Sequence, residues 1–239
     1  PGAPRRGRTP KHASTDTVRQ IAGSRYLRLM AALVFCTAIA TQWTTFQLSV
    51  VADQRFAGNP DQITRFFGTF NFIVGAAGFT FQMLLTSVFL RRFGVTAVIL
   101  ILPMTLAFGS AVTFLFPVFL AVLFTNAADQ GLRFSIDKAA YELLYLPIPP
   151  GQRHSIKAAI DIVGNRIADA VGGVLLGLAT GGFLMFPGGG LGVPGTAAVI
   201  FILSVAWAVI GWRLRKAYVS AIEASIHQKV TEIAGRRSP

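Results

Sequence analysis

Long apolar runs, separated by short polar or Pro/Gly-rich segments, dominate the hydrophobic pattern of the chain. A helix needs about 20 mostly apolar residues to cross a bilayer, and six runs reach that length. The pattern predicts transmembrane helices over residues 27–52, 66–90, 95–116, 118–146, 155–186 and 196–212. The predicted fold class is therefore an all-α integral membrane protein, built as a six-helix bundle.

The fourth of these runs, residues 118–146, is the least apolar because charged residues interrupt it. A hydropathy scan by itself would miss much of this run. Its end is well marked, since Pro147, Pro149 and Pro150 follow closely and proline cannot continue a helix. Its assignment as a span requires that its charges pair with others or face a wet cavity.

The two ends of the chain differ from the apolar middle. Residues 1–25 are basic and rich in Pro and Gly, which predicts a disordered cytoplasmic tail. Residues 217–239 place apolar residues at helical spacing, which predicts an amphipathic cytoplasmic segment. The predicted membrane domain is residues 26–216.

Composition and charge support a membrane protein that does not bind nucleic acid. Hydrophobic residues make up 53% of the chain and charged residues only 13%, although the net charge is +12. The basic residues gather at segment ends: the N-terminal tail, Arg91 and Arg92, Arg153 and Lys157, and the segment after Trp212. With six crossings these positions fall on one side of the lipid bilayer, as the positive-inside rule requires. Both termini are therefore expected in the cytoplasm, at a bacterial inner membrane.

Ionisable residues inside the membrane gather on the fourth and fifth predicted helices. They can mark a substrate pathway, or they can be ion pairs that hold or gate the bundle, and the sequence leaves both interpretations open. On the fourth helix, three of them are spaced by four residues and share one face. The fourth helix carries Asp129, Arg133, Asp137 and a second pair, Lys138 and Glu142; the fifth carries Asp161, Arg166 and Asp169.

The sequence offers no pattern typical of an enzyme or a metal protein. The three histidines are scattered, and Cys36 is the only cysteine. Neither a metal-ligand cluster nor a nucleophile beside a base is visible. We expect no enzymatic activity and no cofactor.

Several motifs resemble a known transporter family. The segment from Asp129 to Gly173, with the YLPIPP hinge at its centre, is similar to the C-terminal half of bacterial ATP/ADP-translocase-like nucleotide transporters, which are relatives of the major facilitator superfamily. RYLRLMAALVF, VADQRF, FFGTFNF and LRRFG resemble the first two helices of the same half. LRRFG also resembles the cytoplasmic loop between the second and third helices of a facilitator half, but the Gly and Asp that usually precede that loop are absent.

The resemblance implies a six-helix half of an alternating-access carrier for nucleotides or other organic anions. Such a half needs a second transporter half, a homodimer or a larger membrane complex around it. The alternative is a non-transporting structural or accessory subunit of a membrane complex. The groups best able to meet an anionic substrate are Arg133, Lys138 and Arg166. The expected counter-charges and gates are Asp129, Asp137, Glu142, Asp161, Asp169, Arg91 and Arg92.

Overall fold

A computed structural model describes residues 15–84, 86–181 and 190–237. Within these ranges the chain is helical and its segments are joined by short turns. The elements are α1 (Thr15–Gly23), α2 (Arg25–Arg55), α3 (Pro60–Leu84), α4 (Thr86–Leu115), α5 (Phe119–Leu132), the π-helical η1 (Arg133–Asp137), α6 (Lys138–Leu144), α7 (Pro150–Ala158), the π-helical η2 (Ala159–Gly164), α8 (Asn165–Ala179) and α9 (Val193–Arg237).

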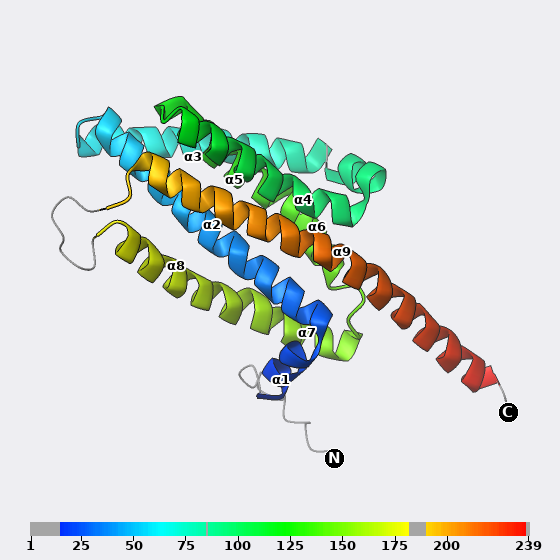
Figure 1. Ribbon diagram of the computed structural model, residues 1–239. Coiled ribbons are helices and arrows are strands. Elements are labelled where there is room, and N and C mark those ends of the chain that lie inside the picture. The colour runs from blue at the N-terminus through cyan, green and yellow to red at the C-terminus, as the bar shows by residue number, and fades with distance from the viewer. Residues whose placement is uncertain (1–14, 85, 182–189, 238–239) are drawn as a thin grey trace, which may run out of the picture.

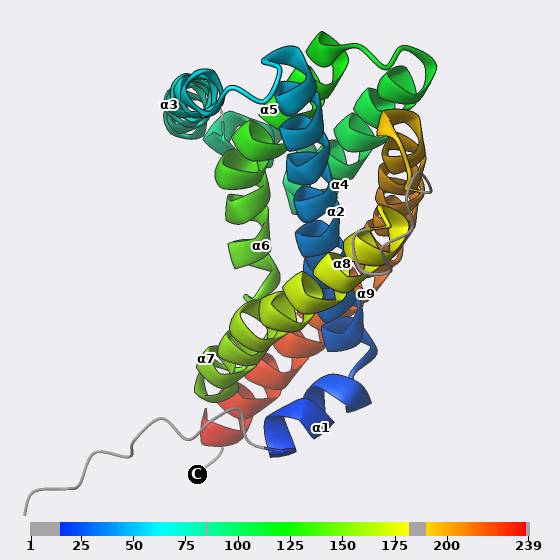
Figure 2. The same ribbon diagram turned by 90° about the vertical axis from the view of Figure 1, so that its left-hand side faces the viewer.

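Helix α2 occupies the centre of the bundle (Figures 1 and 2), where it packs against α5, α8 and α9. Figure 2 shows α3 almost end-on at one edge, inclined to α2. The same view places α1, α7 and the C-terminal end of α9 at one end of the molecule. The turns from α2 to α3 and from α4 to α5 lie at the other end.

The main apolar core lies between α2, α4 and α9, around the fully buried Trp207 and Met30. A smaller core joins α2, α3 and α5 around Leu48 and Val122. A polar contact fixes α2 against the start of α9, because Gln47 Nε2 donates to Thr196 Oγ1 and to the Val193 carbonyl, at 3.0 Å each. Side chains from distant segments therefore hold α2 along its whole length.

Among the described residues, five helices are long and apolar enough to cross a membrane: Arg25–Arg55, Pro60–Leu84, Ala97–Leu115, Gly151–Ala179 and Val193–Ser220. They correspond to five of the six predicted spans. The predicted fourth span is also helical, from α5 through η1 to the end of α6. It is absent from the five because its charged and polar side chains lower its hydropathy.

The structure corrects the expected boundaries in three places. Helix α1 lies within the range 1–25, whose residues 15–23 are thus ordered, while residues 1–14 lie outside the described part of the chain. The second predicted helix, residues 66–90, corresponds to α3 up to Leu84 and to the start of α4 from Thr86, and residue 85 lies outside the described part of the chain. Arg91 and Arg92 lie in this helical part of α4, which breaks at Gly94 (φ 75°), a backbone conformation that glycine adopts readily. The sixth helix continues without a break into the C-terminal segment. The predicted end of the fifth helix, residue 186, falls outside the described residues.

We predict that the close contact between α4 and α5 depends on Gly109. A Cβ atom at this position would lie 2.5 Å from Thr125 Oγ1 and 3.0 Å from its Cγ2, whereas a Cβ at Gly75 would meet nothing within 4 Å. Gly109→Ala should lower the free energy of unfolding in detergent by about 1–3 kcal/mol, because it overpacks this contact. The control Gly75→Ala should leave it unchanged or raise it by about 0.5–1 kcal/mol. Equal effects of the two substitutions would show that the contact is dispensable.

Candidate functional site

A cavity of about 820 Å³ opens between α2, the η1–α6 segment and the η2–α8 segment. Its three walls come from parts of the sequence that are far apart, and α2 forms the longest of them. Polar and charged side chains are distributed over all three walls. They are Thr37, Thr41, Gln42, Thr45 and Ser49 on α2; Arg133, Asp137, Lys138, Tyr141 and Glu142 on the second wall, with Tyr145 just beyond α6; and Asp161, Asn165 and Asp169 on the third.

The α2 wall is a stripe of hydroxyl groups. Thr37, Thr41, Thr45 and Ser49 follow one another at intervals of four residues, so they share one face of the helix. The sequence interpretation did not include this stripe in the site, although its four-residue spacing is the signal that could have found it. The stripe gives an apolar helix a face that can hydrogen-bond to a polar solute.

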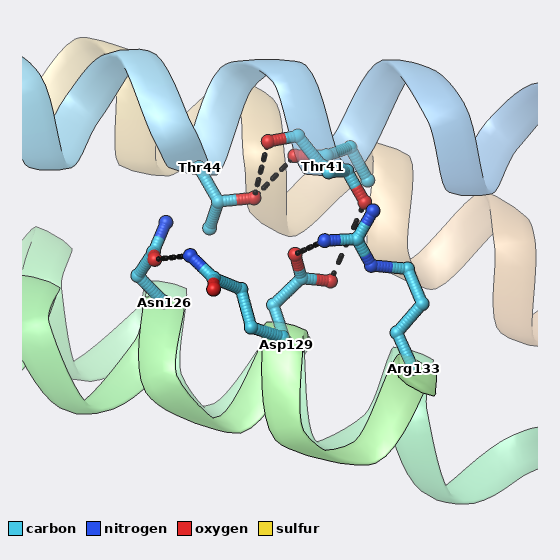
Figure 3. Close-up of polar contacts among 7 residues, drawn as sticks. Thr41, Thr44, Asn126, Asp129 and Arg133 are labelled. Carbon is cyan, nitrogen blue, oxygen red and sulfur yellow. Dashed lines mark hydrogen bonds and ion pairs between the residues drawn. The ribbon is translucent and has the colours of Figure 1, made fainter. Parts of the chain in front are cut away.

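The deepest polar network joins α2 to α5 and η1 (Figure 3). Asp129 is fully buried, and its Oδ2 lies 3.4 Å from Arg133 Nη2. Thr41 Oγ1 donates to Asp129 Oδ1 at 3.5 Å. Figure 3 also shows Asn126, which lies on the same helix one turn before Gln130 and accepts a hydrogen bond from its Nε2 at 2.8 Å. The carboxylate of Asp129 thus holds the Arg133 guanidinium beside the α2 wall.

A second network closes the end of the cavity nearest α7. Lys157 Nζ donates to both carboxylate oxygens of Glu142, at 2.5 and 2.6 Å. Tyr145 donates its hydroxyl proton to Asp161 Oδ1 at 2.5 Å. The pairing expected between Lys138 and Glu142 is therefore wrong, because Glu142 turns to Lys157 across the α6–α7 turn. These contacts tie the second wall to the third.

Two π-helical segments lie in the cavity walls. η1 carries Arg133 and Asp137, and η2 carries Asp161. A π turn bonds residue i to residue i+5 and so widens the helix locally, and such turns are frequent at functional sites. Each π turn changes the direction in which the following side chains point. The regular α-helical spacing read from the sequence therefore does not predict which way these side chains face.

The structure brings together most of the predicted site residues, but not all. Arg133, Lys138, Asp137, Glu142, Asp161 and Asp169 line the cavity. Asp129 lies behind its wall as the partner of Arg133. Arg166 is exposed and is not among the lining residues, and Arg91 and Arg92 are exposed on α4 beside the break at Gly94.

The cavity lining combines two cations, Arg133 and Lys138, with four carboxyl groups, those of Asp137, Glu142, Asp161 and Asp169. Arg133 is 24% exposed and its guanidinium lies 4.8 Å from the centre of the Phe134 ring, while Lys138 is exposed. Ion pairs within the chain involve Arg133 and Lys157, whereas no ion pair within the described ranges involves Lys138. Lys138 is thus the cation of the cavity that is most available to a ligand.

A model of the TLC ATP/ADP transporter family matches residues 4–128. Among curated proteins, the chain is 24% identical over 246 residues to ADP,ATP carrier protein 1 of Chlamydia trachomatis serovar D, an alignment that covers 94% of this chain and 46% of the relative. It is 22% identical over 226 residues to ADP,ATP carrier protein 1 of Rickettsia typhi, covering 85% of this chain and 44% of that protein. The chain thus spans about half the length of the curated relatives it matches. No solved structure matches.

We predict that the two ion pairs of the site differ greatly in their contribution to stability. Arg133→Gln leaves the buried Asp129 without its cation and should lower the free energy of unfolding by about 3–5 kcal/mol. Lys157→Gln breaks a pair whose side chains are 36% and 54% exposed, and should cost at most about 1 kcal/mol. Unfolding in mixed micelles measures both. A Lys157→Gln loss as large as that of Arg133→Gln would contradict this ranking.

Proposed function

Because the chain belongs to the TLC ATP/ADP transporter family, we propose that it is one six-helix half of a nucleotide carrier, with a fold like half of a major facilitator. The observation that carries the proposal is the cavity, which places Arg133 and Lys138 opposite the hydroxyl stripe of α2. A nucleotide presents phosphates to cations and a ribose and base to hydrogen-bonding groups, so its two ends match the two kinds of wall.

The proposal requires a sixth crossing, and α5, η1 and α6 supply it. Residues 119–144 run as one helix, which at about 1.5 Å per residue is about 39 Å long, enough for the hydrocarbon core of about 30 Å. Its charges turn to α2 and the cavity: Asp129 and Asp137 are buried. A polar helix is thus acceptable in the membrane because other helices cover its charged face.

Six crossings place the two termini on the same side of the membrane, and the positions of the basic residues assign that side to the cytoplasm of a bacterial inner membrane. In this topology the Glu142–Lys157 and Tyr145–Asp161 contacts lie at the cytoplasmic end of the cavity. They are placed to act as a gate that opens when the α6–α7 turn moves away from η2. The turn between α2 and α3 then lies on the opposite side.

The roles of the charged groups follow from their places. Lys138 and Arg133 would contact the phosphates, with Asp129 as the counter-charge of Arg133. Glu142 and Asp161 would belong to the gate. Arg166 and Asp169 are exposed on α8, and charges on a membrane helix need a polar neighbour. A second transporter half, either another copy of this chain or a different polypeptide, would supply that neighbour and the other side of the pathway.

The sixth crossing can be tested by cysteine labelling in intact cells, after Cys36→Ala has removed the native thiol. A cysteine at Asn59, in the α2–α3 turn, should react with an impermeant maleimide from outside. A cysteine at His154, in the exposed α7, should react only after the cells are opened, because α5–η1–α6 returns the chain to the cytoplasm. Reaction of both from outside would mean that α5–η1–α6 does not cross.

Transport can be tested with the purified chain in liposomes loaded with ADP, by uptake of labelled ATP. Lys138→Gln should reduce uptake by roughly ten-fold or more, because a hydrogen bond to a charged group contributes about 1.5–3 kcal/mol. The matched control Lys216→Gln, on the exposed side of α9, should transport as well as the unmodified chain. Absence of exchange, together with copurification in fixed ratio with an unrelated membrane complex, would favour an accessory subunit instead.

A further inference from the structure

Asp137 is a carboxyl group whose surroundings the proposed nucleotide site does not explain. Its side chain is 1% exposed, yet it lines the cavity. Its Oδ1 atom has no hydrogen-bond partner among the described residues. A polar atom that is buried without a partner costs about 1–3 kcal/mol, and much more if it carries a charge.

The lack of a partner follows from the π-helical turn. In a regular α-helix the intervals of four residues would place Arg133 between Asp129 and Asp137, within reach of both. η1 spans Arg133 to Asp137, and its wider turn reduces the rotation per residue along this interval. Arg133 consequently pairs with Asp129 at 3.4 Å, and no ion pair to Asp137 is formed in the described part of the chain. Of the two buried carboxyl groups, only that of Asp129 therefore pairs with the guanidinium.

The groups around Asp137 offer no replacement for that cation. The charges that act on Asp137 are those of Asp129 and Arg133. From α6, Tyr141 lies nearby, but its hydroxyl is 2.8 Å from Thr37 Oγ1 of α2 and occupied by it. The adjacent Lys138 is exposed. The other titratable or charged residues of the elements packed against this segment are Arg25, Tyr26, Arg28, Cys36, Asp53 and Arg55 on α2, Asp61 and Arg65 on α3, and Arg91 and Arg92 on α4.

The charged residues of α2, α3 and α4 lie near helix ends or beside the break at Gly94. Cys36 lies in the middle of α2, but its thiol carries no charge that could replace the cation. α3 packs against the end of α5, just before η1, where a Cβ atom at Gly78 would lie 3.4 Å from the Gly131 carbonyl oxygen. Arg65 is 13 residues away along α3, or about 20 Å. The negative charge of an ionised Asp137 would therefore stay uncompensated within the bundle, where water cannot fully solvate it.

We propose that Asp137 is a proton-binding site, occupied by a proton that exchanges with the cavity. A metal ion would need several oxygen ligands, and the described residues contain no group of three acidic, His or Cys side chains that could hold one. A proton needs only the one unpartnered oxygen. Binding converts the carboxylate to a neutral acid, whose O–H can donate to water in the cavity, and release returns the proton to that water as hydronium.

Proton release would also change the partner of Arg133. When Asp137 is ionised, the guanidinium is drawn towards two carboxylates, and straightening η1 into an α-helix would bring it within reach of the second one. Proton occupancy and the π turn are thereby coupled. Because Arg133 lines the cavity, the proton would also bias how strongly the cavity attracts an anion, which deepens the proposed nucleotide site without depending on it.

The proton can be observed directly by infrared spectroscopy of the full chain in lipid, with ¹³C-labelled aspartate. At neutral pH the spectrum should contain the C=O band of a protonated carboxyl group, and Asp137→Asn should remove it. The matched substitution Asp61→Asn, at an exposed carboxylate on α3, should leave the band in place. Asp137→Asn resembles the protonated acid and should unfold at the same temperature as the unmodified chain or higher, which checks that the variant is folded.

A spectrum at neutral pH without a protonated band that depends on Asp137 would overturn the proposal, as would a marked loss of thermal stability in Asp137→Asn. A band that sodium ions displace would point to a shared cation site and would also overturn proton binding as the resident state. In the liposome assay, a transmembrane pH difference should alter uptake by the unmodified chain and should not alter it in Asp137→Asn. Failure of nucleotide uptake with the band present would reject the proposed carrier function and leave the proton site standing.

Discussion

The ion pair between Asp129 and Arg133 is the contact that makes the rest of the bundle possible. A helix with this many charges enters a membrane only if its neighbours cover them, and α2 does so with Thr41 on one side while α5 and η1 provide the pair itself. The same contact brings a guanidinium to the wall of the cavity. One set of atoms thus both covers charge inside the bundle and lines the cavity.

Charge placement also explains why the bundle has a cavity at all. Helices α2, α4 and α9 meet through apolar side chains and pack closely. On the other side of α2, the hydroxyl stripe faces charged residues of η1, α6 and α8, which cannot fill space as hydrocarbon side chains do. Contact between α2 and α8 is close at Gly172, where a Cβ atom would collide with Gln42. The space on either side of that contact is left to water and solutes.

Much of the fold followed from the sequence, because an apolar run of bilayer length leaves the chain few alternatives to a helix. The charged residues of the site were also identifiable, since charges inside such runs are costly and few. The residues with which these charges pair could not be identified from the sequence. The interval between Lys138 and Glu142 suggested a pair, yet Glu142 binds Lys157 across a turn whose geometry hydropathy does not describe. The π turns were equally hidden, because helical spacing assumes the regular rotation that η1 and η2 depart from.

The continuous helix α9 has a mechanical consequence. Its 45 residues extend for about 68 Å, roughly twice the thickness of the hydrocarbon core. Its first part packs against α2 and α4, and Tyr218 still contacts Tyr26 near the end of the bundle, with ring centres 6.4 Å apart. Beyond that point the helix projects from the bundle (Figure 1). Any rotation of the bundle within the membrane would thus sweep the projecting end through an arc, carrying the movement of the cavity to whatever lies beside the membrane surface.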